Sequence, residues 1–137
     1  MTLVVSVKTC LSKYATWQGR ASRSEFWYFI LFCAICAALA QVIDIVLGIT
    51  FKFTNPATGQ EQITTYGFTY ALVLLGTLLP NLAVCIRRLH DTNRSGWYYW
   101  IGLVPLIGWI LLLVWFCSAG TTGENSYGPD SRRDKAS

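Results

Sequence analysis

The chain has 137 residues, of which 53% are hydrophobic and only 13% are charged, and its net charge is +4. Soluble domains usually carry about 25% charged residues, so this deficit excludes an ordinary water-soluble domain. The positive charge does not indicate nucleic-acid binding, because no basic face with interleaved aromatic residues lies outside the apolar segments. We therefore expect a small membrane protein whose cations attract anionic lipid headgroups.

Residues 1–18 predict an amphipathic helix that lies in the membrane interface. Leu3, Val7, Leu11 and Tyr14 recur at helical spacing, and Lys8 falls at the flank of this apolar stripe. The same stripe would equally suit a helix that packs on the rest of the protein. Both interpretations stay open at this point.

Three apolar segments, at about residues 26–48, 68–86 and 97–117, are each long enough to cross a bilayer. A span needs about 20 apolar residues, and unpaired backbone groups exclude open strands in lipid. The sequence thus predicts an all-α protein with three transmembrane helices in a membrane domain at 19–117. A polar tail at 118–137 follows, and we expect its end to be disordered. We expect the first span to be retained, because a long polar segment precedes it.

The first span begins with a capping signal. Ser22 and Glu25 stand at the spacing at which each side chain bonds the other residue's backbone amide. Arg20 and Arg23 flank this start and are expected to reach lipid headgroups.

Polar residues inside the spans are candidates for a solute path. Gln41 and Asp44 share one face of the first span, and Asn81 follows Pro80 in the second. An acid within a span is a functional hypothesis, but Asp44 is close enough to the span's end to reach interfacial water, which we favour. For Asn81 we favour a hydrogen bond between helices over a role in permeation.

The distribution of lysine and arginine predicts the orientation. Seven cations flank the first two spans on the side of residues 1–25 and 87–96, whereas the polar loop at 50–66 holds Lys52 alone. The positive-inside rule then places the amino terminus in the cytoplasm and the loop outside. Three crossings would put the tail outside as well. A third segment that turned back at Pro105 would return the tail to the cytoplasm, but its length fits one crossing better than two.

The densest ionisable group is Arg87, Arg88, His90 and Asp91, at the end of the second span. His90 and Asp91 suggest an acid–base pair, and the arginines suggest a phosphate clamp. A simpler interpretation is favoured, because cations at a helix carboxyl end interact with the dipole and with lipid phosphates. Adjacent helical residues also point in different directions, so His90 and Asp91 need not meet.

The five cysteines do not predict a metal or redox centre. Cys33 and Cys36 have a redox-like spacing, but they lie in an apolar span where a thiolate is unfavourable. We expect no metal, no cofactor and no catalytic residue.

Three blocks in order make the chain resemble a known family, the small bacterial inner-membrane proteins of domain of unknown function 805. The blocks are Gly19 to Trp27, then Arg87 to Asp91 with Ser95-Gly96-Trp97, and then Gly120 to Asp130. The resemblance covers about residues 14–130 and implies a multi-pass protein of the bacterial inner membrane. It supplies no catalytic residues, because the activity of the family is not established.

Three functions remain open from the sequence. A non-catalytic membrane component that binds lipids or protein partners is favoured, because no complete catalytic constellation is visible. A subunit of an oligomeric channel or transporter would use Gln41, Asp44 and Asn81, since three spans enclose little on their own. An enzyme acting on lipid headgroups at the cytoplasmic face would use His90. The expected partners are membrane lipids, a second copy of the chain or another membrane protein.

Overall fold

The protein was analysed as a computed structural model, which describes residues 2–133. The expected disorder at the end of the tail falls on residues 134–137, outside the described residues. The chain forms two compact units. The terminal unit comprises Met1–Ile30 with Leu79–Ser137, and the hairpin unit comprises Leu31–Leu78.

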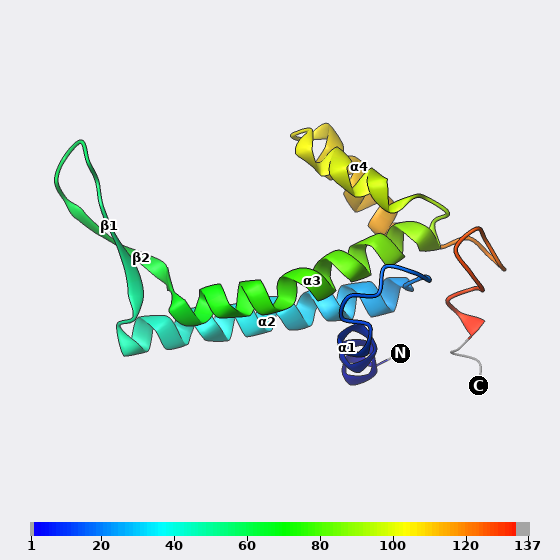
Figure 1. The fold of residues 1–137 in the computed structure, drawn as a ribbon, viewed down its shortest axis with the longest axis horizontal. Coiled ribbons are helices and arrows are strands. Elements are labelled where there is room, and N and C mark those ends of the chain that lie inside the picture. The colour runs from blue at the N-terminus through cyan, green and yellow to red at the C-terminus, as the bar shows by residue number, and fades with distance from the viewer. Residues whose placement is uncertain (1, 134–137) are drawn as a thin grey trace. The chain divides into compact units, whose positions relative to one another are not determined.

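Two long helices run through both units. They are α2 (Arg23–Leu47) and α3 (Phe68–Asp91), and they match the first two spans expected from the sequence (Figure 1). Only 17% of the most apolar stretch of α2 and 22% of that of α3 is buried, so their surfaces suit lipid rather than water. Within residues 2–133, these are the two helices long and apolar enough to cross a membrane.

Local signals explain where α2 begins and ends. The hydroxyl of Ser22 accepts a hydrogen bond from the amide of Glu25 at 3.3 Å. At the other end Gly48 has φ +66°, and the amide of Ile49 donates to the carbonyl of Asp44 at 3.0 Å. This is the glycine-terminated turn that commonly satisfies the last carbonyl groups of a helix.

The third expected span is not one continuous helix. Instead, the 3₁₀ helix η1 (Gly96–Leu103) and α4 (Ile107–Cys117) fold back on one another (Figure 1). The indole of Trp109 donates to the carbonyl of Gly102 at 2.8 Å. At rises of about 2.0 and 1.5 Å per residue, neither helix is long enough to cross about 30 Å of hydrocarbon.

The fold-back has a physical cause at Pro105 and Leu106. The amide of Ile107 donates to the carbonyl of Pro105 at 2.9 Å across Leu106, whose φ is +63°, which makes a tight γ-turn. Gly108 then lies directly against the carbonyl of Ile101, where any Cβ atom would collide. The turn-back at Pro105 that the sequence left as the less favoured alternative is therefore the one observed.

The segment at 50–66, expected as a polar loop, is largely a β-hairpin. Strands β1 (Thr50–Thr54) and β2 (Glu61–Gly67) pair antiparallel, with Lys52 opposite Ile63 and an irregularity between Thr50 and Lys52. The pairs Asn55-Pro56 and Thr58-Gly59, which are typical turn signals, form the tip, where the carbonyl of Asn55 accepts from the amide of Gly59 at 2.8 Å.

Asp44 connects the end of α2 to the start of α3 within the hairpin unit. Its carboxylate is fully buried and accepts from the amides of Thr69 and Tyr70 at 3.0 and 2.9 Å. These amides belong to the first turn of α3, where the helix itself supplies no acceptor. Asp44 therefore caps α3, which replaces the expectation that it reaches interfacial water.

Helix α1 (Leu3–Ser12) is shorter than the expected 1–18, and its buried residues are Ser6 and Cys10. The apolar residues Val4, Val5 and Leu11 are exposed instead. The face that packs on the protein is thus centred on Ser6 and Cys10, with Leu3 and Val7 half-buried beside them.

Replacing Asp44 by alanine should lower the free energy of unfolding by about 1–2 kcal/mol, because two helix-terminal amides lose their acceptor. Asp44→Asn, which keeps a good capping oxygen, should cost less. Chemical unfolding in detergent micelles, followed by circular dichroism, measures both. Equal losses for the two variants would show that capping is not what Asp44 contributes.

Candidate functional site

The centre of the terminal unit is the carboxylate of Asp91, the last residue of α3. Its Oδ1 accepts from Arg20 Nε at 2.9 Å and from the hydroxyl of Ser131 at 2.7 Å. Its Oδ2 accepts from Arg88. The side chains of Arg20, Arg88 and Asp91 are 2%, 0% and 3% exposed, so one carboxylate is paired with two guanidinium groups away from bulk water. We call this group, with the Arg87–Glu25 pair described below, the arginine network.

The tail docks on this network. Arg20 donates to the carbonyls of Thr121 and Gly123 at 2.6 and 2.7 Å. The amide of Thr121 donates to the carbonyl of Asp91, and Asn125 donates to that of His90, both at 2.9 Å. These bonds satisfy carbonyl groups at the end of α3 that the helix leaves open. The tail therefore lies beside the start of α2 and the end of α3 (Figure 1).

Arg88 adds a second connection between the blocks. Its Nε donates to the carbonyl of Phe116 at 3.1 Å, and its terminal nitrogens donate to Asp91 and to the carbonyl of Ser118. These two carbonyls lie at the end of α4 and just after it. One guanidinium thus holds the returning end of the η1–α4 hairpin against α3.

A second buried ion pair fixes α1. Arg87 Nη1 lies 2.6 Å from Glu25 Oε1, with the two side chains 0% and 6% exposed. The thiol of Cys10 lies 3.6 Å from the same carboxylate oxygen and 3.8 Å from Arg87 Nη2. Burial, reinforced by the negative charge of Glu25, raises the pKa of Cys10 to about 12. Cys10 is therefore a protonated thiol that donates to Glu25.

The expected capping box at the start of α2 forms only in part. Ser22 accepts from the amide of Glu25, but the Glu25 carboxylate turns to Arg87 and Cys10 instead of bonding Ser22. An arginine of fixed charge is a stronger partner than a backbone amide in a buried place. Within the described chain, Arg87 Nε is the one buried side-chain nitrogen or oxygen without a hydrogen-bond partner.

His90 and Asp91 do not form an acid–base pair. His90 Nδ1 lies 3.1 Å from the carbonyl of Gly19, and its ring stacks on Tyr127 with centroids 4.0 Å apart. The imidazole also lines an apolar pocket of 420 Å³ with Trp17, Leu82 and other side chains of the terminal unit. Neither contact of His90 is shared with the carboxylate of Asp91.

The remaining candidates are distributed as follows. Arg23 is exposed on the first turn of α2, where it donates weakly to the carbonyl of Cys117 at 3.4 Å. Asp44 and Gln41 belong to the hairpin unit, and Asn81 is half-buried in the terminal unit. The polar residues expected to line a solute path are thus divided between the two units.

The sequence did not indicate Cys10, Ser131 or the tail carbonyls as members of the network. The glycines at 120, 123 and 128 are a clue to the role of the tail carbonyls, since close backbone approach favours residues without a side chain. A Cβ atom at Gly120 would collide with the carboxylate of Asp91. In residues 2–133 no group of three or more histidine, cysteine, aspartate and glutamate side chains is placed to hold a metal ion.

Comparison with known proteins identifies the family. The family model described as "Protein of unknown function (DUF805)" matches residues 14–129. The chain belongs to the DUF805 family. The three charged blocks by which the sequence resembled this family are the parts that meet in the arginine network.

Curated relatives match over most of their length. The chain is 43% identical to "Inner membrane protein YhaI" of Escherichia coli (strain K12), covering 89% of this chain and 91% of the relative. It is 40% identical to "Inner membrane protein YhaH" of the same strain, covering 89% and 92%. A more distant relative, "Uncharacterized protein YiiR", is 28% identical over 85% of this chain and 86% of the relative. No solved structure gives a significant match.

Family membership and the two long apolar helices together make this DUF805 chain a membrane protein whose relatives are inner-membrane proteins. The expected location is confirmed at that level. Each charged side chain of the arginine network finds its partners inside the protein, either in an opposite charge or in backbone carbonyls.

Replacing Asp91 by asparagine should lower the free energy of unfolding by about 3–5 kcal/mol, because Arg20 and Arg88 would keep buried charges without a partner. Glu124→Gln removes an exposed acid from the same unit and should change stability by about 0.5 kcal/mol or less. Unfolding in detergent measures both, and limited proteolysis should cut the tail faster in Asp91→Asn alone. Similar behaviour of the two variants would contradict a structural role for Asp91.

Proposed function

We propose that this DUF805 protein is a non-catalytic component of the bacterial inner membrane that binds anionic phospholipid headgroups at the cytoplasmic face. The observation that carries this proposal is the internal pairing of the network charges. The buried charged side chains of the network bind one another or the backbone, and they therefore stabilise the fold instead of binding a ligand. These residues are Glu25, Arg87, Arg88 and Asp91. The cations that remain exposed on the terminal unit are free to meet lipid.

The orientation follows from two crossings rather than three. With α2 and α3 as the spans, the segments before α2 and after α3 lie on one side of the membrane, and the β-hairpin lies on the other. The tail then lies on the same side of the membrane as the residues of α2 and α3 that it contacts. In the described residues Lys52 is the cation of the hairpin, while the flanking segments hold six cations and the adjoining helix ends add Arg23, Arg87 and Arg88. The positive-inside rule places the flanking segments in the cytoplasm.

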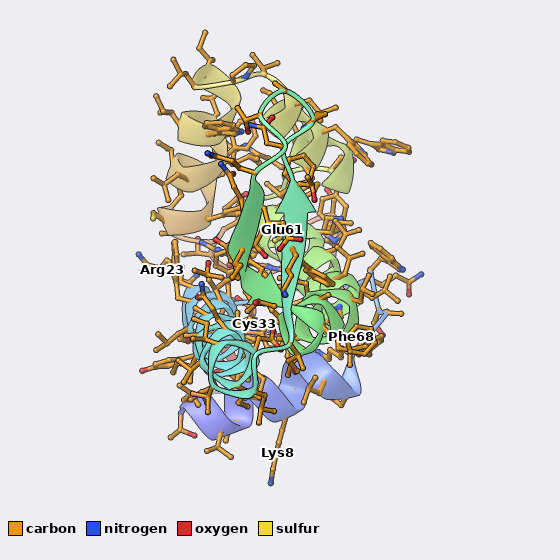
Figure 2. All side chains as sticks on the ribbon, turned by 90° about the vertical axis from the view of Figure 1, so that its left-hand side faces the viewer. Lys8, Arg23, Cys33, Glu61 and Phe68 are labelled. Carbon is orange, nitrogen blue, oxygen red and sulfur yellow. The ribbon has the colours of Figure 1, made fainter. Side chains whose placement is uncertain are left out.

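The exposed surface of the terminal unit suits a membrane interface. Lys8 points outward from α1 (Figure 2), beside the exposed Val4 and Leu11. Trp17 and Trp27 are each 39% exposed, and such aromatic residues favour the headgroup level. The exposed cations of this unit are Lys8, Lys13, Arg23, Arg132 and Arg133. Each cation near an anionic surface contributes about 1 kcal/mol.

A second candidate is an enzyme that acts on lipid headgroups, and one observation favours it. His90 lines the 420 Å³ pocket while its Nδ1 is held by the carbonyl of Gly19. Such an arrangement orients an imidazole. Ser95 and Tyr99 line the same pocket, but the Ser95 hydroxyl caps η1 by accepting from the amide of Trp97, and most of the other lining residues are apolar. We therefore favour the non-catalytic function.

The test compares phosphatidylglycerol with phosphatidylcholine bound to the protein in mixed micelles, measured by native mass spectrometry. The wild type should enrich the anionic lipid, and the Lys8→Gln/Lys13→Gln double variant should lose about fivefold of the preference per lysine. The preference should also fall as salt is raised.

The control is Lys52→Gln, which removes a cation from the hairpin. It should leave the lipid preference unchanged. A wild type without any preference for phosphatidylglycerol, or an equal loss in Lys52→Gln, would refute the proposed function.

A further inference from the structure

We propose that a polar pocket between the start of α2 and the tail binds a phosphate group, carried either by a lipid headgroup or by a soluble phosphate ester. The pocket has a volume of 210 Å³. Its charged and hydroxyl lining comes from Ser22, Arg23, Ser24, Asp91, Ser131 and Arg132. This inference rests on the proposed cytoplasmic orientation for the source of its ligand.

The charges around the pocket favour an anion. Arg23 and Arg132 line it directly, whereas Asp91, the acid in its wall, is already bound by Arg20 and Arg88. An acid that is compensated by two buried guanidinium groups contributes little repulsion toward a second anion. The net field in the pocket is therefore positive, and the dipole of the adjoining first turn of α2 adds to it.

Arg132 is held in place for this role. Its Nε lies 3.0 Å from Asp130 Oδ1, and its Nη2 lies 2.9 Å from Asp130 Oδ2, while the side chain stays 46% exposed. Asp130 is itself fixed by accepting from the amide of Gly123 at 2.9 Å. The Arg132 guanidinium is thus oriented by one carboxylate. A phosphate approaching from the pocket can bind its remaining edge, because a guanidinium has five N–H donors.

The opposite wall supplies hydroxyl groups. Ser22 and Ser24 lie within 3.2 Å of each other, and Ser131 donates to Asp91. Serine hydroxyls rotate readily between partners, so they provide neutral donors beside the two cations. Guanidinium and hydroxyl donors around a small space are the chemistry that recognises phosphate oxygens.

The size of the pocket limits the ligand. Pockets for drug-sized molecules usually occupy about 300–1,000 Å³, so 210 Å³ suits a phosphate with a short substituent rather than a nucleotide. The floor is formed in part by Ala119 and Gly120, and no larger side chain fits at Gly120 against Asp91. The close contact between Gly120 and Asp91, which docks the tail, therefore also keeps the pocket open.

The experiment uses the full chain purified in a phosphate-free maltoside detergent, at constant ionic strength set with chloride. Isothermal titration calorimetry is performed with inorganic phosphate, glycerol 3-phosphate and dihexanoyl phosphatidylglycerol. The variants are Arg23→Gln and Arg132→Gln, with Arg23→Lys as a conservative form and Lys52→Gln as an exposed-cation control. Circular dichroism and thermal unfolding establish that each variant is folded.

We expect at least one phosphate probe to bind the wild type and to bind each glutamine variant about tenfold more weakly. Lys52→Gln should bind like the wild type, and Arg23→Lys should fall between the wild type and Arg23→Gln. Binding of the soluble probes would identify a free phosphate ester as the ligand class. Binding of the short-chain lipid alone would identify a headgroup.

The inference is overturned if no probe binds, or if folded Arg23→Gln and Arg132→Gln variants bind every probe like the wild type. Such a result leaves the lipid preference measured with Lys8 and Lys13 intact. Conversely, phosphate binding in a protein without a preference for phosphatidylglycerol would refute the proposed function and keep the pocket.

Discussion

The structure of the terminal unit depends on one buried carboxylate, that of Asp91, shared between Arg20 and Arg88. A buried charge left without its partners costs several kcal/mol, so the three segments that contribute these groups must come together or none of them is stable. Through Arg88 the same carboxylate holds the end of the η1–α4 hairpin, and through Arg20 it holds the tail. The residues that look most like catalytic groups in the sequence are thereby committed to the fold.

Much of the fold was predictable from local signals. The apolar runs that form α2 and α3 are long enough for the bilayer, and Ser22 and Gly48 mark the start and end of α2 in the expected way. The turn signal at Asn55 was likewise confirmed at the tip of the hairpin. These features depend on residues close together in the chain, which is why the sequence alone reveals them.

The features that sequence reasoning missed depend on distant contacts. The alternation of polar and apolar residues in Thr50–Thr54 is typical of a strand. Its pairing partner, however, lies beyond the turn, in a segment whose composition indicates a polar loop. The segment at 97–117 has the composition of a span, but it folds back through the turn at Pro105 and Leu106 and the close approach of Gly108 to Ile101. Asp44 became a cap of α3 because two helices meet there, which no spacing within α2 could indicate. Of the candidate site residues, five meet in the arginine network, namely Arg20, Glu25, Arg87, Arg88 and Asp91, whereas Arg23 and His90 lie outside it. Cys10 and Ser131 carry no motif that could indicate them.

The charged block before α2 and the tail meet at the end of α3, and we infer from this contact that both ends of the chain lie on one side of the membrane. The most direct test fuses a reporter that is active in one compartment to each end of the full-length protein in turn. The account predicts the same compartment for both fusions, and the positive-inside rule makes it the cytoplasm. Opposite compartments for the two ends would contradict the account, because Arg20 could not then reach the carbonyls of Thr121 and Gly123.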